Sequence, residues 1–373
     1  MTFRNPDLDV NPQRLALWNT PQRRRQSFRR LNDIQRRGLS FRAPAVRPLA
    51  MSESPALAGL PELQKLLHMD GFCALVVARD DRILLARHAP DFATDRLHSI
   101  QSITKTFVHL ALGKLVAAGQ VDPAARIGSY VPEAGDAYAD ATVQQVLDMD
   151  VASNFSEDYA DPYAPCPPRG APVGYARQEI AMGWRLPPAG EPEFGVRSFA
   201  AGLVRAGRSD NRATLYASPN SDMLGWVIER ASGRSLASHV EEIVTEAGLE
   251  AAFHVSADCH GVPVLSGGGM MTARDLARHG LLIARRGGSF LQDAMSGAGT
   301  RYGGSPTLRY RNHLMSNGTW VGHPGYAGQF LMVDPARQAA AAFFSVLETE
   351  YGERDGHFAE IIAALSGLLR QLD

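Results

Sequence analysis

The chain has 373 residues, of which 45% are hydrophobic and 21% are charged, and its formal net charge is -1. This length allows one large domain or two, and the composition is that of a globular protein with a sizeable core. Because the charges nearly cancel, no global field would attract nucleic acid or an anionic membrane, and we expect neither as a partner.

The sequence gives no sign of export or membrane insertion. Its first residues, MTFRNPDLDVNPQRL, lack the apolar segment of a secretory signal, and no run of about 18 apolar residues occurs. The three cysteines, Cys73, Cys166 and Cys259, are odd in number and widely spaced, which fits neither a zinc site nor a disulfide framework. We therefore expect a cytoplasmic protein with reduced cysteines, and a homodimer is compatible with the sequence.

The first 55 residues are rich in arginine and proline and are predicted to form an N-terminal extension, with residues 56–373 as the body. The extension contains the basic run PQRRRQSFRRLNDIQRRGLSFR from Pro21 to Arg42. A run of this kind can contact RNA or lipid, but a solvated arm or a helix packed on the body is the more common outcome.

Along the body, the pattern first predicts a β-hairpin and then helices. Residues 71–88 are two apolar runs around a short polar break, which is typical of a hairpin. An apolar helix begins near Ser102, and residues 141–153 have helical spacing. The stretch from Asn154 to Arg212 is rich in proline, glycine and tyrosine and is predicted to be mostly loop, which in a compact protein is often functional.

The second half of the body is predicted to contain two helices, a second hairpin and a closing helix. Helical spacing follows Ser221, a predicted N-cap, and ends at Gly233. Thr272 and Asp275 form a predicted capping box ahead of an amphipathic helix. Residues 319–348 hold two strand-like runs around a turn, and residues 358–373 form a closing amphipathic helix.

This order predicts an α+β fold. Strands near both chain ends, at about 60–118 and 305–373, are expected to form one antiparallel sheet flanked by helices. The helical and loop region at about 119–304 is expected to form an inserted subdomain beside it.

Ser102 and Lys105 are the first candidates for chemistry, in the stretch SITK. A serine hydroxyl needs a neighbouring base to become a nucleophile, and residues three apart share one helix face. The helix start adds free N–H groups that could form half of an oxyanion hole. The motif is short, however, and a serine at a helix start is also an ordinary cap.

Two later motifs carry further candidates. In YASPN, Tyr216 could serve as general acid or base. In GHPGYAGQF, the glycines allow a substrate to approach the backbone, and an N–H near Gly325 or Tyr326 could complete the oxyanion hole. His323 could bond a carboxylate or Tyr216. Each motif alone is also compatible with a packed loop tyrosine or a glycine-rich turn.

Together and in this order, the motifs resemble the serine hydrolases related to class C β-lactamases and penicillin-binding proteins. Tyr216-Ala217-Ser218 is similar to that family's second motif, and His323-x-Gly325 to its third, with histidine in place of lysine. The resemblance implies a β-lactamase-like fold, with Ser102 as the acylated nucleophile and with Lys105 and Tyr216 sharing the proton relay.

SEDYADP, MGWR, YASPNSDMLGWVIERASG and SGGGMMTARDLARHG further resemble the 6-aminohexanoate-dimer (nylon-oligomer) hydrolase branch. This implies that Tyr159 contacts the substrate near the leaving amine. Ser266 takes a place where that branch has a bulkier polar residue. The stretch between Tyr159 and Tyr216 is longer than in that branch, which could alter substrate preference.

The function expected from these residues is hydrolysis of a small-molecule amide or ester through an acyl-enzyme on Ser102. The same site could serve a transacylase or amide synthase, while a β-lactamase, a cell-wall peptidase and a non-catalytic binding protein are weaker alternatives. The sequence contains no HExxH motif, histidine cluster or P-loop, and no metal or other cofactor is predicted.

Overall fold

The computed structural model describes residues 12–160, 173–207 and 212–372 of the chain. Cys166 and residues 161–172 and 208–211 of the stretch between Tyr159 and Tyr216 lie outside these residues. Cys73 and Cys259 are free thiols. No helix in the described ranges is long and apolar enough to cross a membrane.

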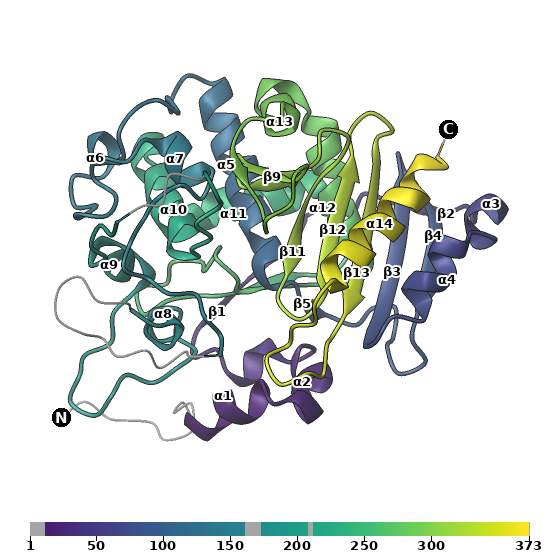
Figure 1. The fold of residues 1–373 in the computed structure, drawn as a ribbon, viewed down its shortest axis with the longest axis horizontal. Helices are drawn as coiled ribbons and strands as arrows, with labels where there is room; N and C mark the ends of the chain where they lie inside the picture. Colours follow the sequence, from purple (N-terminus) through teal and green to yellow (C-terminus); the bar gives the residue numbers. More distant parts are fainter. Residues whose placement is uncertain (1–11, 161–172, 208–211, 373) are drawn as a thin grey trace.

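A large sheet runs through the middle of the molecule (Figure 1). Over the described residues it has nine strands in the order β2-β4-β3-β13-β12-β11-β10-β9-β8. All neighbouring pairs are antiparallel except β2 and β4, which are parallel. The bounds are β2 Ala50–Met51, β3 Phe72–Arg79, β4 Arg82–His88, β8 Thr300–Arg301, β9 Arg309–Arg311, β10 Leu314–Ser316, β11 Val321–Gly325, β12 Gln329–Asp334 and β13 Ala339–Ser345.

A smaller sheet lies beside it, with four strands over the described residues in the order β1-β6-β7-β5. These strands are β1 Gly38–Phe41, β5 His98–Ser99, β6 Phe253–Ser256 and β7 Gly269–Met271. Strand β5 leads into the short 3-10 helix η3 (Gln101–Lys105), which carries Ser102.

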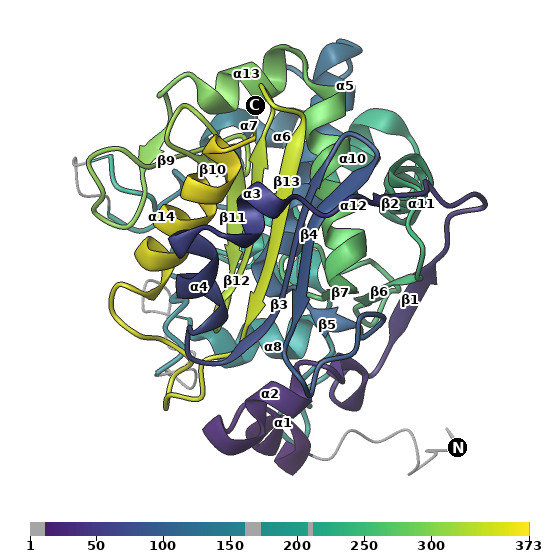
Figure 2. The same ribbon diagram turned by 90° about the vertical axis from the view of Figure 1, so that its right-hand side faces the viewer.

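Helices cover both faces of the large sheet (Figure 2). One face carries α4 and α14, and the other carries α12, with α5 and the rest of the helical part behind it (Figures 1 and 2). The helix bounds are α1 Pro12–Trp18, α2 Pro21–Ser27, α3 Pro55–Ala58, α4 Pro61–Leu67, α5 Thr106–Ala117, α6 Ile127–Tyr130, α7 Val143–Leu147, α8 Tyr175–Ala181, α9 Val196–Ala201, α10 Pro219–Ser232, α11 Leu236–Ala247, α12 Ala273–Arg286, α13 Gly288–Met295 and α14 His357–Arg370; a further 3-10 turn, η2, spans Leu31–Asp33.

Strand β13 separates two hydrophobic cores. Because side chains alternate along a strand, Ala340 and Phe344 join the core on the α12 side, whereas Ala341 and Phe343 join the core on the α14 side. A Cβ added to Gly280 of α12 would lie 2.7 Å from the Cβ of Ala340. Small residues on both elements therefore let the helix pack closely on the sheet.

The predicted α+β, β-lactamase-like architecture is confirmed. Both hairpins form, as β3–β4 and β12–β13, and strands from the two chain ends pair where Val77 lies opposite Ala341. Gly233 ends α10 with φ 68°, and Thr272 caps α12 by accepting the N–H of Asp275.

The predicted cap at Ser221 is wrong. Helix α10 begins two residues earlier, at Pro219, whose fixed φ suits a first helical position. The hydroxyl of Ser221 instead lies 2.9 Å from Nε2 of His313 inside the protein. The Ser221 side chain, which the local sequence assigned to a helix cap, therefore contacts His313, a residue far along the chain.

The N-terminal segment is more tightly integrated than an arm. Strand β1 pairs with β6 and strand β2 pairs with β4, so residues before the predicted boundary at 55 supply strands to both sheets. The basic run is not an exposed polycation either. Arg24 is fully buried, and Arg25 and Arg29 both form ion pairs with Asp91.

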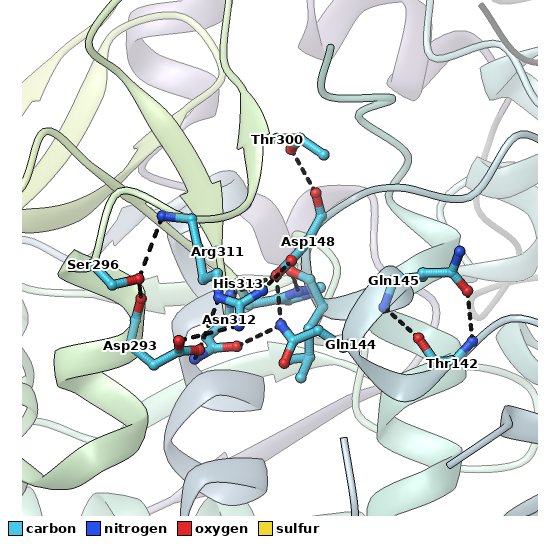
Figure 3. A network of polar contacts seen from close by, with 12 residues as sticks. Thr142, Gln144, Gln145, Asp148, Asp293, Ser296, Thr300, Arg311, Asn312 and His313 are labelled. Atoms are coloured by element: carbon cyan, nitrogen blue, oxygen red, sulfur yellow. Dashed lines mark hydrogen bonds and ion pairs between the residues drawn. The ribbon is translucent and has the colours of Figure 1, made fainter. Parts of the chain in front are cut away.

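A polar network joins the end of α7 to the hairpin of β9 and β10 (Figure 3). Asp148 accepts hydrogen bonds from Arg311 Nη1 at 2.8 Å and from the N–H of Asn312 at 3.1 Å, while Arg311 also pairs with Asp293. Burial raises the pKa of Asp148 to about 6, although the charge of Arg311 opposes this rise. The network fixes the hairpin from which Tyr310 reaches toward the site.

Candidate active site

Ser102 lies in η3, at the junction between β5 and the long helix α5. The preceding residue, Gln101, has φ 48°, a left-handed conformation that is uncommon for a residue with a side chain. Its amide Nε2 donates to Ser99 Oγ at 2.7 Å. Conformations of this kind persist where the surrounding structure enforces them, often at functional sites.

Lys105 is fully buried and faces Ser102. Its Nζ lies 3.0 Å from Ser102 Oγ and 2.9 Å from Ser218 Oγ, and it is also hydrogen-bonded to the backbone oxygen of Ser266. Burial lowers the pKa of Lys105 to about 8, with smaller opposing effects of nearby carboxylates. With this pKa about a tenth of the amine is neutral at pH 7, and this neutral form can accept a proton.

Tyr216 stands next to this pair. Lys105 Nζ lies 5.1 Å from the centre of the Tyr216 ring. Burial raises the pKa of the Tyr216 phenol well above its usual value, as do the nearby Tyr310 phenol and other acidic groups, while a hydrogen bond with Ser102 opposes the rise. A phenol with a raised pKa keeps its proton at neutral pH, so Tyr216 is suited to donate one.

Glu157 is a central member of the site that the sequence did not single out. Its Oε2 accepts the backbone N–H of Ser218 at 2.6 Å, and its Oε1 accepts the Ser218 hydroxyl at 2.7 Å. Tyr159 donates its hydroxyl to the same Oε1 at 2.8 Å. Two predicted site residues, Ser218 and Tyr159, are therefore held by one carboxylate.

A second carboxylate, Asp222, is buried on the same side of Lys105. Gln178 Nε2 donates to Asp222 Oδ2 at 3.2 Å. Burial raises the pKa of Asp222 to about 7, and the Ser266 hydroxyl and Lys105 oppose the rise. Ser266 itself is 2% exposed, with its Oγ 3.9 Å from the sulfur of Met182.

His323 lies behind Tyr216 rather than at the surface of the site. Its ring is fully buried, with Nε2 2.8 Å from the Tyr310 hydroxyl and Nδ1 2.7 Å from the carbonyl oxygen of Pro324. Burial lowers its pKa well below the usual value, so the ring is neutral. His323 is thus hydrogen-bonded to Tyr310, whereas the sequence predicted a hydrogen bond to a carboxylate or to Tyr216.

Gly325 brings strand β11 against the Ser102 segment. A Cβ at this position would lie 2.7 Å from the carbonyl oxygen of Ile100, two residues before Ser102. Only glycine permits this approach without a backbone shift. The next residue, Tyr326, packs its ring 4.9 Å from that of Tyr159.

Two cavities meet at Ser102, and both are also lined by Tyr159 and Tyr326. One has a volume of about 360 Å³ and is further lined by Ser266, Tyr175, Trp184 and part of the N-terminal helix α1. The other, of about 400 Å³, is further lined by Tyr216, Tyr302, Glu157 and Phe358. Ser102, the candidate nucleophile, is therefore accessible to a substrate that extends into both cavities.

Sequence reasoning missed Glu157, Asp222 and Tyr310 for related reasons. Glu157 lies in a loop segment, and its partner Ser218 is 61 residues away. Asp222 lies in α10, where a charged residue near a helix start has an ordinary explanation. The signal available for Glu157 was its place two residues before Tyr159, in the quoted stretch SEDYADP.

Comparison with known proteins identifies the family. The sequence pattern of the Beta-lactamase family matches residues 73–365. The 6-aminohexanoate-dimer hydrolase of Paenarthrobacter ureafaciens is 30% identical over 289 residues, covering 75% of this chain and 69% of that protein.

Two solved structures have the same fold. The "Putative 6-aminohexanoate-dimer hydrolase from Bacillus anthracis" superposes with a TM-score of 0.77 at 18% identity, covering all of this chain and 97% of that one. A penicillin-binding protein homolog from Caulobacter crescentus gives a TM-score of 0.61 at 15% identity, covering 85% of this chain and 98% of that one. The chain therefore belongs to the beta-lactamase family, and it is a serine hydrolase of the amidase and esterase kind.

Proposed function

We propose that the protein hydrolyses a small-molecule amide or ester through an acyl-enzyme on Ser102. The observation that carries this proposal is the buried Lys105 amine, 3.0 Å from Ser102 Oγ, with its pKa lowered to about 8 by burial. A serine needs such a base within hydrogen-bond reach to attack a carbonyl. The name of the Paenarthrobacter relative, a 6-aminohexanoate-dimer hydrolase, supports an amide as one substrate class.

In the acylation step, Ser102 Oγ bonds to the carbonyl carbon and its proton passes to Lys105 Nζ. The oxygen of the tetrahedral intermediate takes the negative charge, and the backbone N–H groups of Ser102 and Tyr326 are its proposed donors. The bond to the leaving nitrogen or oxygen then breaks, and Tyr216 donates a proton to that atom. Lys105 returns its proton to Tyr216, so the serine proton ends on the leaving group.

In the second step, water replaces the leaving group. Lys105 accepts a proton from the attacking water, the bond to Ser102 Oγ breaks, and the serine recovers a proton from Lys105. The products are a carboxylic acid and free enzyme. An amine in place of water would give an amide instead, which is the transacylase alternative.

The two cavities support a division of the substrate. Tyr216 lines the cavity that also contains Tyr302 and Phe358. Because Tyr216 is the proposed proton donor, the leaving half is placed in that cavity. The acyl half is then placed in the other cavity, beside Ser266 and Trp184.

Intact-protein mass spectrometry with p-nitrophenyl acetate tests the proposal. The wild type should gain one acetyl group and then lose it in water, whereas Ser102→Ala should gain none. Ser129→Ala, which changes an exposed serine of α6, is the matched control and should behave as the wild type. Acetylation of Ser102→Ala at the wild-type rate would overturn the proposal. Adding an amine separates hydrolysis from transfer, and a chromogenic cephalosporin in the same assay tests β-lactam turnover.

A further inference from the structure

The N-terminal helix α1 forms one wall of the cavity that the acyl half is proposed to occupy. The cavity is lined by Leu15, Ala16 and Trp18 of α1 and by the next residue, Asn19, as well as by Ser102. These residues lie ahead of residue 73, where the match to the family begins. Figure 1 shows α1 and α2 (purple) beside the loop between β13 and α14 (yellow). A segment outside the family pattern thus contributes to the surface around the nucleophile.

This wall is anchored by Trp18. Its indole Nε1 donates to the carbonyl oxygen of Arg30 at 3.1 Å, and its ring stacks on Phe28 with 4.9 Å between the ring centres. Phe28 is completely buried, and Trp18 is 7% exposed. The helix is therefore fixed to the core rather than lying loosely over the cavity.

Arg24 adds a second anchor through all five of its N–H donors. Nε and one Nη2 hydrogen bond go to the side-chain and backbone oxygens of Asn19, at 2.9 and 2.7 Å. The other three reach the backbone oxygens of Leu347 and Thr349, each at 2.7 Å, and of Glu350 at 3.1 Å. Because Arg24 is fully buried, these bonds join α1 and α2 firmly to the loop after β13.

The anchored segment also touches the proposed oxyanion strand. Asn19 Nδ2 donates to the Tyr326 hydroxyl at 3.3 Å, and that hydroxyl donates to the carbonyl oxygen of Tyr351 at 2.7 Å. Tyr326 and Tyr159 line both cavities. The position of α1 is thus coupled to a tyrosine that both cavities share with Ser102.

From these contacts we propose that α1 sets the upper size of the acyl group that Ser102 accepts, with Ala16 and Trp18 as specificity-determining residues. The inference rests on the proposed function. Three charged residues line the cavity: Glu179 and Arg185 pair with each other through bonds of 2.6 and 2.8 Å, and Glu350 is exposed to solvent. With the charges of this pair compensated and several aromatic rings in the wall, the cavity suits a neutral, apolar or aromatic acyl group.

The test compares two substitutions on adjacent positions of α1. Ala16 is exposed and lines the cavity, whereas Leu17 is 45% exposed and does not line it. Substrates are p-nitrophenyl acetate, butyrate and octanoate, which vary the acyl half, and the acetates of phenol and 2-naphthol, which vary the leaving half. Ala16→Phe should lower kcat/KM for the octanoate relative to the acetate by roughly tenfold, since a pocket discriminates chain length by contact and exclusion. Leu17→Phe should keep the wild-type profile.

Trp18→Ala tests the opposite change, because it enlarges the cavity that Ala16→Phe would fill. Removing the indole should raise the octanoate-to-acetate ratio severalfold, and thermal unfolding of the same sample reports whether the variant remains folded. An unchanged acyl profile in Ala16→Phe would overturn the inference, as would a change confined to the leaving-group series. If instead the wild type never forms an acyl-enzyme on Ser102, the proposed function itself fails.

Discussion

Both oxygens of the Glu157 carboxylate contact Ser218, one at the backbone N–H and one at the hydroxyl. The same hydroxyl oxygen lies 2.9 Å from Lys105 Nζ. The Glu157 carboxylate is thus linked to Lys105, the proposed base, through the Ser218 hydroxyl. Its negative charge favours the protonated form of the lysine and partly opposes the lowering of the lysine pKa by burial. The pH at which Lys105 loses its proton depends on the balance between burial and this charge.

The rate of acylation should rise with pH as Lys105 loses its proton. Because burial lowers the pKa of Lys105 to about 8, kcat/KM for a neutral ester should increase through an apparent pKa near 8 and then level off. Lys105→Met should remove this rise and lower kcat/KM by about a hundredfold or more, the range typical of a lost general base. A wild-type profile that is flat between pH 6 and 9 would contradict the assignment.

Glu157→Gln should move the same rise to lower pH. Removing the negative charge withdraws stabilisation from the protonated lysine, so the pKa of Lys105 falls further below its usual value. The measurement is the pH dependence of kcat/KM in the variant and the wild type. Asp158→Asn is the matched control, because it removes an exposed neighbouring carboxylate that accepts a hydrogen bond from the N–H of Ala160. An unmoved midpoint in Glu157→Gln, or a shift to higher pH, would show that the carboxylate does not act on the lysine.

Gly325→Ala should damage both stability and activity. The new Cβ would lie 2.7 Å from the carbonyl oxygen of Ile100, so the strand or the Ser102 segment must move. Overpacking of this kind costs about 1–3 kcal/mol, and the movement displaces Tyr326 from Ser102. Urea unfolding and kcat/KM report the two effects. For comparison, Gly59→Ala places a Cβ no closer than 3.9 Å to another residue and should leave both nearly unchanged. Equal unfolding midpoints for the two variants would argue against the close approach.

Local patterns predicted much of this architecture because they depend on nearby residues. The continuous apolar run Ala339–Ser345 is typical of a strand buried on both faces, and the three-residue spacing of Ser102 and Lys105 indicates a shared helix face. What the sequence did not reveal depends on partners far along the chain. Glu157 is part of the site only because the fold places it beside Ser218. Likewise, the Ser221 hydroxyl contacts His313 instead of capping the helix.

The N-terminal segment illustrates the same limit. Its arginines predicted a solvated arm or a helix packed on the body, the usual outcomes for a basic run. In the folded chain, Arg24 lies in a helix packed on the body and is buried, and three of its five hydrogen bonds reach backbone oxygens more than 300 residues away, such as that of Leu347. Nothing in the local composition around Arg24 indicates those acceptors, so neither its burial nor the position of α1 in the cavity wall could be derived from sequence.

A last prediction concerns stability in acid and the buried histidine His279. Its ring stacks on Phe107 at 4.6 Å, and its Nε2 lies 2.8 Å from Thr106 Oγ1. Burial, aided by the charges of Arg286 and His109, lowers the pKa of His279 to about 3. The folded protein therefore keeps this ring neutral, whereas the unfolded chain protonates it near pH 6.5.

The stability that follows from this difference is fully present above pH 6.5 and is lost as the pH falls toward 3, because only the unfolded state binds the proton. His279→Gln removes that proton, so the free energy of unfolding from urea titrations should fall less steeply with acidification between pH 6 and 4.5. The difference in slope should be at most about 1.4 kcal/mol per pH unit, the value for one proton. His98→Gln, at another fully buried ring with a pKa of about 3, should have a similar effect, and the two should add in the double variant. If the free energy of unfolding falls as steeply with acidification in both single variants as in the wild type, neither ring is kept neutral by folding.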